Sequence, residues 1–498
     1  MKIMKARNCV ISAVGKSSLH KIWTDGERDF DFHLIVYDDS LEQFRNDAEY
    51  VCHIKGFKLK VIYKYLEANP QFKDMYDYYF FPDDDIRMDA ATINALFDAM
   101  RRYDLKIAQP ALRMSYFTWQ HTLYDRYRKL RYTNFLEMMV PCFSRDALQK
   151  VLFTFNENET GWGTETHWPL LIDATQHDMA IIDEVTVVHT RPIRSGQEIH
   201  NRELAAYLHK FGLTTWVESY DVIPSRDEGM YCCDRTTFMS IRSMLVHWIG
   251  SEGISSMHMG EDGYFGFVHF LFLLADITQS QKYADAALGL LEKVQDGLGA
   301  VKDDMSFTHG ITGCSWLIEY LVGENMLQEN PQELLEDVDT YIRQYAENHA
   351  DSLTVTELAG IGKYYLAKFH NRPDAANRMA LQNTGQAIME KLNPPRSFHD
   401  MRVSLDALEI QDECGADVSN LARSLERLVN QMEVSRLEQA YCLFRLYTVT
   451  HDAYLHVRVR EGLKTLAPRL MNLSDALLLA EMLYYTPNRN PNINHYNR

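Results

Sequence analysis

Tyr76-Asp77-Tyr78-Tyr79-Phe80-Phe81-Pro82-Asp83-Asp84-Asp85-Ile86-Arg87 is an aromatic run that ends in three consecutive carboxylates. Aromatic residues favour a buried strand, and acids at the end of such a strand lie at the carboxyl edge of a sheet, where open α/β folds bind ligands. Adjacent carboxylates repel one another unless a cation lies between them, and oxygen ligands suit Mg²⁺ or Mn²⁺. The stretch therefore predicts an α/β sheet with a divalent-cation site. A solvated acidic turn is the alternative.

Strands and helices alternate around this run. Residues 9–14 and 30–39 are apolar stretches that predict strands, the second also ending in acids, and residues 56–66 carry a helical pattern. Such alternation is typical of an α/β sheet. The turn at residues 15–18 has neither the GxGxxG nor the GxxxxGKS/T spacing. A dinucleotide-binding loop and a Walker phosphate loop are therefore not expected.

The sequence Gly161-Trp162-Gly163-Thr164-Glu165 places a carboxylate close to a glycine-flanked indole. A sugar ring can stack its apolar face on an aromatic side chain, and an acid can bind a hydroxyl or remove its proton. The motif therefore predicts a sugar-binding turn, with a tryptophan that merely anchors the turn as the alternative. Predicted strands flank it at residues 107–112 and 180–192, and residues 137–145 predict a strand followed by a helix.

The last of these strands ends in His189-Thr190-Arg191. An imidazole is a competent ligand for Mn²⁺, although a lone histidine is usually structural. The guanidinium two residues later suits a phosphate. This strand end is therefore a second candidate for the cation site.

The ordered set of DDD, GWGTE and HTR resembles the GT-A glycosyltransferase fold, a Rossmann-type nucleotide-sugar domain. In that fold a DxD motif holds a metal on the nucleotide diphosphate, and a late histidine often completes the coordination. More narrowly, YDYYFFPDDDI, AQPAL, EMMVPCFSR and GWGTE resemble an uncharacterised glycosyltransferase-like family of plants and bacteria, known as a domain of unknown function. The resemblance covers roughly residues 5 to 200. It implies that Asp83, Asp85 and His189 bind Mn²⁺ or Mg²⁺ and that Glu165 is the acceptor-side acid.

Sugar transfer builds negative charge on the departing diphosphate, which a metal and nearby cations stabilise. Arg191 and one of Lys55 or Lys58 are the candidates for this charge. Glu165 would deprotonate the acceptor in an inverting reaction, and Glu165 or Glu137 would hold it in a retaining one. Further substrate contacts are expected from Asp38, Gln109, Trp162 and Gly163.

Beyond residue 197 the apolar spacing changes to long windows of period 3.6 and predicts helices alone up to the C-terminus. A polar, proline-bearing stretch at residues 224–229 marks a linker, and we predict domains at residues 1–222 and 223–498. Short loops favour stacked helical hairpins. Glycines recur where helices begin, for example Gly266 and Gly313, and these would let chain segments approach closely.

The stretch Ser306-Phe307-Thr308-His309-Gly310-Ile311-Thr312-Gly313-Cys314-Ser315-Trp316-Leu317-Ile318-Glu319-Tyr320-Leu321 resembles lanthionine synthetase C-like proteins, which are α/α toroids. The resemblance covers roughly residues 235 to 490. The cyclases hold zinc with two cysteines and a histidine, one pair being an adjacent Cys-His. This sequence has no such pair, and Cys314 and Cys442 fall in apolar helices, where a small buried hydrophobe is favoured. Zinc-activated thiol chemistry is therefore not expected.

The composition of the chain limits the classes of partner and the cellular compartment that we expect. A formal net charge of −18 argues against nucleic-acid or anionic-membrane binding, since both need a basic surface. No apolar run approaches the roughly 18 residues of a membrane span, and no signal-peptide core is evident. Eight cysteines without a CxxC pair are typical of reduced thiols. We expect a cytoplasmic protein.

Together these features predict a metal-dependent glycosyltransferase of the hexosyltransferase type. It would transfer a sugar from a nucleotide-sugar donor to a peptide or glycan acceptor that the helical toroid presents. Two alternatives remain open. One is a non-catalytic peptide-binding scaffold with a degenerate transferase domain, and the other is a carbohydrate-active enzyme based on the toroid.

Overall fold

The computed structural model describes residues 8–116, 119–192, 197–225, 231, 233–251, 260–261, 263–323, 327, 331–433, 435–464 and 472–484. The chain forms two compact units, residues 1–226 with 279–281, and residues 227–278 with 282–498. The predicted domain boundary, between residues 222 and 223, lies inside the strand β10 (Ser219–Pro224). The division between the two units follows this strand, between residues 226 and 227. Of the predicted linker at residues 224–229, Pro224 ends β10, and residues 226–229 lie outside the described residues.

The first unit is built on one mixed sheet with the strand order β10-β7-β9-β6-β8-β4-β1-β2-β3, and β5 pairs with β9. The strands β1, β2, β3 and β4 are parallel neighbours, as are β6 and β9, whereas β7, β8 and β10 run antiparallel to their partners. The bounds are β1 (Asn8–Val14), β2 (Phe30–Val36), β3 (Tyr50–His53), β4 (Tyr78–Phe80), β5 (Ile86–Arg87), β6 (Ile107–Leu112), β7 (Arg128–Thr133), β8 (Cys142–Ser144) and β9 (Met179–His189).

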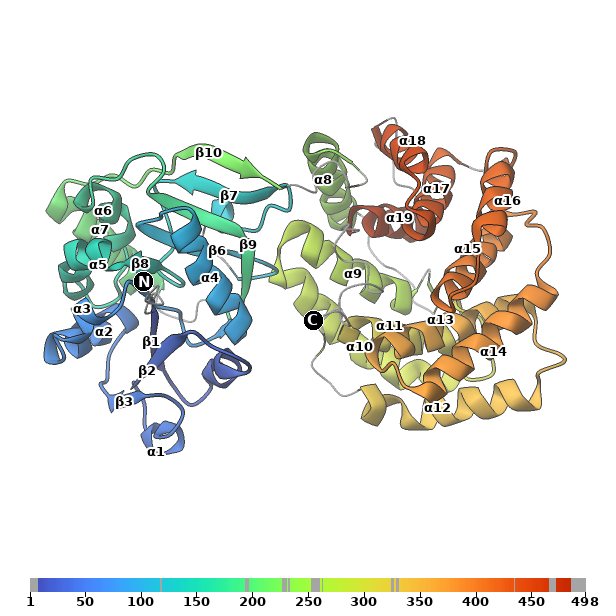
Figure 1. The fold of residues 1–498 in the computed structure, drawn as a ribbon, viewed down its shortest axis with the longest axis horizontal. Coiled ribbons are helices and arrows are strands. Elements are labelled where there is room, and N and C mark those ends of the chain that lie inside the picture. Colours follow the sequence, from blue (N-terminus) through green and yellow to red (C-terminus); the bar gives the residue numbers. More distant parts are fainter. Residues whose placement is uncertain are drawn as a thin grey trace, which may run out of the picture. The chain divides into compact units, whose positions relative to one another are not determined.

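Helices cover both faces of this sheet (Figure 1). Alternate residues of β1 enter different cores: Cys9 and Ile11 join one with Leu59, and Val10 joins the other with Phe97. This is the period-2 alternation of a strand buried on both faces. The helices are α1 (Leu41–Phe44), α2 (Lys58–Ala68), α3 (Phe72–Met75), α4 (Ala90–Arg102), α5 (Arg145–Val151), α6 (Thr164–Leu171) and α7 (Gln197–Phe211).

Strand direction brings the predicted motifs to one edge. The strand β8 is antiparallel to both β4 and β6, so β4, β6 and β9 all run the same way. Asp83 to Asp85 follow β4, and His189 is the last residue of β9. The prediction that both motifs lie at the carboxyl edge of one sheet is confirmed.

The expectation of helices alone beyond residue 197 is wrong at β10. This strand pairs with β7 at the edge of the sheet, and most of its residues are exposed. An edge strand with so few buried side chains has no apolar run by which a sequence could predict it.

The second unit is helical, and six of its helices contact one another in a closed series: α9, α11, α13, α15, α17 and α19 each contact the next, and α19 contacts α9. Most of the other helices of this unit pack against this series (Figure 1). The series comprises α9 (Tyr264–Thr278), α11 (Ile311–Gly323), α13 (Val355–Asn371), α15 (Phe398–Glu413), α17 (Arg436–Thr450) and α19 (Leu473–Tyr484). The other helices are α8 (Arg235–Ser251), α10 (Gln281–Gly297), α12 (Pro331–Asn348), α14 (Ala375–Lys391), α16 (Ser419–Val429) and α18 (Ala453–Lys464).

Close approach at the helix starts requires glycine. A Cβ atom on Gly266 would lie 1.7 Å from the carbonyl oxygen of Glu261, and one on Gly313 would lie 1.9 Å from that of Phe307. Both distances are far inside van der Waals contact, which confirms the prediction drawn from the recurring glycines.

The cysteines in this unit behave as small apolar residues. Cys314 in α11 and Cys442 in α17 are buried, and burial raises the pKa of each thiol to about 12. Thiolate ligands are therefore disfavoured at both positions. Within the described part of the chain, no helix is long and apolar enough to cross a membrane.

Candidate active site

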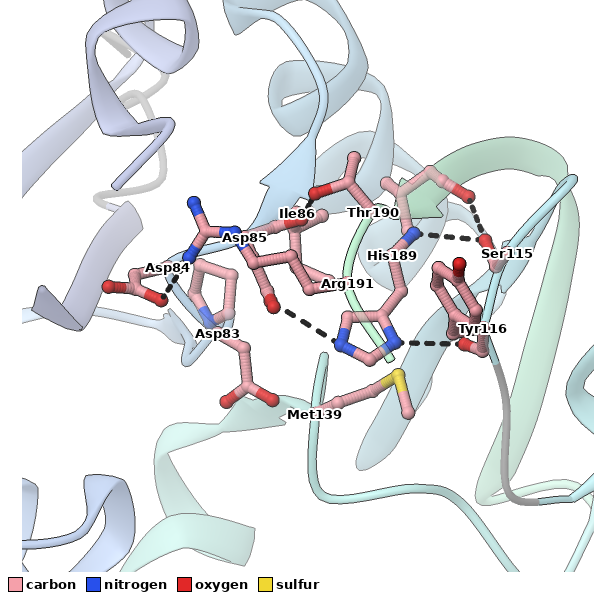
Figure 2. A network of polar contacts seen from close by, with 12 residues as sticks. Asp83, Asp84, Asp85, Ile86, Ser115, Tyr116, Met139, His189, Thr190 and Arg191 are labelled. Atoms are coloured by element: carbon pink, nitrogen blue, oxygen red, sulfur yellow. Dashed lines mark hydrogen bonds and ion pairs between the residues drawn. The ribbon is translucent and has the colours of Figure 1, made fainter. Parts of the chain in front are cut away.

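The triple aspartate forms a turn that its backbone holds in place. Asp83 donates its N–H to the carbonyl of Met139 at 2.8 Å, and the N–H of Ile86 closes the turn on the carbonyl of Asp83 at 3.4 Å. The carbonyl of Asp85 accepts from Thr190, from its N–H at 3.1 Å and from its hydroxyl at 2.8 Å. The turn is thus tied to the end of β9, as Figure 2 shows.

The three carboxylates point in different directions. Asp84 accepts from the backbone N–H of Gly15 and from the hydroxyl of Tyr37, both at 2.9 Å, and lies 3.9 Å from Arg191. Asp83 and Asp85 instead face His189, and one ligand atom from each of these three residues lies within 4.8 Å of the other two. The geometry thus groups Asp83 and Asp85, the pair that the resemblance implies, with His189.

His189 is fixed through its other ring nitrogen. Its Nδ1 lies 2.8 Å from the carbonyl oxygen of Tyr116, and its Nε2 lies 3.4 Å from Asp85 Oδ1 (Figure 2). A carbonyl partner on Nδ1 favours the tautomer whose Nε2 lone pair can bind a metal. Burial works to lower the pKa of His189, but the hydrogen bond and charge of Asp85 outweigh it and raise that pKa. The same contact, with the charge of Arg191, outweighs burial and lowers the pKa of Asp85.

Lys58 adds a fixed cation beside Asp83. Its ammonium lies 2.5 Å from Asp83 Oδ1 and also donates to the carbonyls of Phe81, Met138 and Met139. Burial lowers the pKa of Lys58 and raises that of Asp83, in each case against the pull of the partner's charge. The ammonium of Lys58, whose side chain is 12% exposed, therefore pairs with a carboxylate that is 34% exposed towards the pocket.

These residues line a pocket of about 350 Å³. The predicted residues that line it are Lys58, Asp83, Asp85, Glu137, Trp162, Glu165, His189 and Arg191. These predicted residues bring the three candidate cation ligands together with two basic side chains, two further acids and an indole.

Four predicted residues do not line this pocket. Lys55 is an exposed residue that pairs with Asp39 at 3.1 Å. Asp38 accepts from the N–H of Lys16 at 2.7 Å, and Gln109 is buried, where its side-chain oxygen accepts from the N–H of Glu137 at 2.7 Å. The fourth, Gly163, directly precedes α6 and has a left-handed φ of +96°. Gln109 and Gly163 therefore support neighbouring pocket residues.

The GWGTE motif places its acid deep in the structure. The Glu165 side chain accepts from the N–H of Gly163 at 3.0 Å and belongs to a residue that is only 8% exposed. Burial raises the pKa of Glu165 to about 7, although its backbone hydrogen bonds oppose the shift. This carboxyl can therefore gain or lose a proton near neutral pH.

Several aromatic rings are among the pocket residues that the sequence did not reveal. The ring of His200, on α7, stacks on Trp162 with centroids 4.8 Å apart and an interplanar angle of 11°. Trp119 donates its backbone N–H to Glu137 at 2.6 Å. Phe57 lies directly before Lys58, so the basic segment could have pointed to it. No local pattern marks His200 or Trp119.

Comparisons with known proteins agree with the two family resemblances, to a domain of unknown function and to lanthionine synthetase C-like proteins. Residues 9–210 match the family described as protein of unknown function (DUF707), and residues 259–391 match the family described as lanthionine synthetase C-like protein. None of the curated protein sequences matches the chain.

Among solved structures, the crystal structure of S. aureus TarS matches at 7% identity and a TM-score of 0.25, over 84% of this chain and 55% of that one. The chain thus spans little more than half the length of that protein. A likeness at this level carries no argument about fold or function.

Proposed function

We propose that the first unit is a metal-dependent glycosyltransferase of the GT-A type that transfers a hexose from a nucleotide-sugar donor. The observation that carries the proposal is the convergence of Asp83, Asp85 and His189 within 4.8 Å at the carboxyl edge of the sheet. Two carboxylates and an imidazole held by a carbonyl are a donor set that suits Mn²⁺ or Mg²⁺. A divalent cation bound there would neutralise a diphosphate and stabilise the charge that it gains as the sugar leaves.

Two side chains in the pocket supply charge of their own. Arg191 lies beside the triple aspartate and presents a guanidinium, which binds phosphate oxygens through parallel hydrogen bonds. Lys58 holds Asp83 in place and adds a buried positive charge, which is only weakly screened. Both favour a negatively charged leaving group over a neutral one.

The acceptor side is assigned to Glu165 and Trp162. A carboxyl whose pKa is about 7 is half ionised near neutral pH, so Glu165 can accept the proton of an attacking hydroxyl. Trp162, stacked on His200, offers a flat surface for a sugar ring. Glu137 lines the same pocket and is the candidate for holding the acceptor.

We infer that the second unit is an α/α toroid that presents the acceptor. The closed series of contacts from α9 to α19 and back to α9 supports this inference. A ring of helices leaves a concave centre, and concave surfaces are where ligands bind.

A screen of nucleotide sugars tests the proposal. The full chain is incubated with UDP-, GDP- and TDP-hexoses with and without Mn²⁺, and release of the nucleoside diphosphate is measured. We expect Mn²⁺-dependent release from at least one donor and about a 10²-fold or greater loss in Asp85→Asn. The matched control Asp39→Asn, whose side chain is 93% exposed, should keep full activity. Release that is equal without metal, or equal in Asp85→Asn, would contradict the proposal.

A further inference from the structure

Charged side chains converge inside the second unit. They come from different helices of the closed series and from the loop before α9. We call the following residues the ring cluster: Glu261, His269, Lys363, Arg402, Asp406, Glu409, Arg445 and Glu481.

Each cation of the ring cluster pairs with a carboxylate of the cluster. Arg402 donates to both carboxylate oxygens of Glu261, at 2.8 and 2.6 Å. Arg445 donates to Asp406 at 2.9 Å, and Lys363 lies 3.3 Å from the same carboxylate. Ion pairs therefore connect the helices α13, α15 and α17.

Glu481 has a different environment. One of its oxygens accepts from the hydroxyl of Tyr441 at 2.6 Å, and the other lies 3.9 Å from His269 Nδ1, beyond hydrogen-bonding distance. Burial lowers the pKa of His269 to about 3, so this imidazole is neutral at physiological pH. The side chain of Glu481 remains 23% exposed, so a ligand can reach this end of the cluster.

An aromatic wall stands beside these charges. Trp316 stacks on Tyr320 with centroids 4.9 Å apart and an interplanar angle of 18°, and it meets the ring of Phe307 edge-on at 5.0 Å. The ammonium of Lys363 lies 3.6 Å from the centre of the Phe307 ring. His269 contacts Trp316 edge-on at 5.2 Å. The aromatic wall therefore contacts the ring cluster directly, through His269 and Lys363.

The balance of charge indicates the kind of ligand. Four acids face three bases in the ring cluster, and most of these charges are already paired, so it lacks the excess of cations that a phosphate needs. Buried ion pairs are weak evidence for a purely stabilising role, because desolvation offsets their attraction. Paired charges still offer both donors and acceptors, as sugar hydroxyls require. A flat aromatic face completes the requirements of a sugar ring.

We propose that the ring cluster and the wall of Phe307, Trp316 and Tyr320 form a binding site for a neutral oligosaccharide. A sugar ring packs on Trp316, and its hydroxyls bind Glu481 and the paired groups of Arg445 and Asp406. The site extends the inference that the second unit presents the acceptor, and it is independent of the chemistry in the first unit, because no residue of that unit takes part.

Binding of neutral pentasaccharides to the full chain tests this site. Calorimetry is carried out with cellopentaose, chitopentaose, maltopentaose, mannopentaose and xylopentaose, and with a pool of unmodified peptides. We expect at least one sugar to bind, with affinity at least tenfold weaker in Trp316→Ala and in Glu481→Gln. Glu347→Gln, an exposed acid on α12, and Asp85→Asn, in the first unit, should bind as the parent chain does.

Trp316→Ala and Glu481→Gln remove different interactions from the site. Trp316→Ala removes packing, so its folding is checked by circular dichroism, whereas Glu481→Gln keeps the shape and the hydrogen bond from Tyr441 and decides the test if Trp316→Ala does not fold. Absence of binding by all five sugars, binding of the peptide pool in their place, or unchanged affinity in Glu481→Gln would overturn the proposal. Because Asp85→Asn removes the proposed transferase activity alone, failure of either proposal is visible without the other.

Discussion

Three neighbouring aspartates have different tasks because the turn sends their side chains apart. Asp84 binds back to Gly15 and Tyr37, while Asp83 and Asp85 face His189. The motif is therefore part anchor and part ligand set. A substitution at each position separates these tasks.

We predict that two isosteric substitutions affect different properties, one the affinity for Mn²⁺ and the other the stability of the fold. Asp85→Asn should weaken Mn²⁺ binding about tenfold or more, because it removes a charged ligand. Asp84→Asn should keep Mn²⁺ affinity within a few-fold but lower the free energy of unfolding by about 1–3 kcal/mol, because a hydrogen bond to a charged acceptor is weakened. Calorimetric Mn²⁺ titration and urea unfolding measure the two effects. Equal loss of Mn²⁺ affinity in both variants would contradict the assignment.

The pH dependence of activity should report Glu165. As a base it must be ionised, so the rate should rise with pH through the pKa of about 7. In Glu165→Gln we expect a loss of about 10²–10⁴ in kcat and the disappearance of this limb. A pH–rate profile of both proteins checks the role, and an unchanged profile in the variant would assign the base elsewhere.

The same carboxyl predicts a stability effect that needs no substrate. The folded pKa of about 7 lies above the unfolded value of 4.5, so the parent chain binds the Glu165 proton more tightly when folded and loses stability as pH rises between these values. Gln does not titrate. The melting temperature of Glu165→Gln relative to the parent should therefore increase from pH 4.5 to pH 7 and then level off. A difference that is constant with pH would show that the carboxyl is not buried as described.

Site residues could be predicted from the sequence where a single segment contains the whole motif. They were harder to predict where the fold brings distant segments together. The acids, His189 and Glu165 each end or follow a recognisable strand or turn. Lys55 and Lys58 looked equivalent in sequence, but Gly56 turns the chain between them and only Lys58, the first residue of α2, lies in the pocket. His200 comes from a helix whose pattern gives no hint of Trp162.

At the scale of elements, the turn before α6 depends on the conformation of Gly163. Its φ of +96° disfavours a side chain, and a Cβ atom would lie 3.2 Å from both Leu204 and Tyr207 on α7. Gly26 has nearly the same φ, +95°, with nothing within 4 Å. The pair separates backbone strain from crowding.

We therefore predict that Gly26→Ala costs about 1–2 kcal/mol of stability from strain alone. Gly163→Ala should cost at least about 1 kcal/mol more, because α7 must shift, and it should also weaken activity by displacing Trp162 and Glu165. Denaturant unfolding of both variants measures the difference. Equal losses of unfolding free energy in the two variants would mean that α7 accommodates the added methyl group without a measurable cost.

Elements buried on both faces were predictable, and edge elements were not. The strands β1, β4, β6 and β9 have apolar runs that mark them clearly. By contrast, β7 reads Arg-Lys-Leu-Arg-Tyr-Thr, in which only Leu130 and Thr133 are buried, and β10 is largely exposed. Period and hydrophobicity carry little signal when solvent covers most of a strand.

At the scale of the molecule, the two units should unfold in separate steps, as multidomain chains commonly do. Leu479 on α19 is 1% exposed in the helix that closes the series against α9. Leu479→Ala should destabilise the second unit by about 2–5 kcal/mol through the cavity that it leaves. Its control, Leu334→Ala on α12, removes a leucine that is 40% exposed and should have little effect.

Calorimetric melting with and without Mn²⁺ separates the units. We expect Leu479→Ala to lower one transition only, while Mn²⁺ raises the other by the same amount as in the parent chain. A single transition that responds to both changes would show that the chain unfolds as one body.

The two-part organisation was accessible from the sequence because hydrophobic period changes along the chain, and both family matches agree with it. The closure of the helices was not, since contact between α19 and α9 joins segments about 200 residues apart, beyond any local pattern. The same holds for part of the ring cluster, since Glu261 meets Arg402 and His269 meets Glu481 across long stretches of the chain.

The central claim is that Asp83, Asp85 and His189 together hold a divalent cation. Crystals of the full chain grown with Mn²⁺ and UDP, measured near the manganese absorption edge, test it directly. The account predicts an anomalous peak about 2–2.5 Å from a side-chain atom of each of the three residues, which is lost in Asp85→Asn. A manganese peak at other residues, or none between these three, would contradict it.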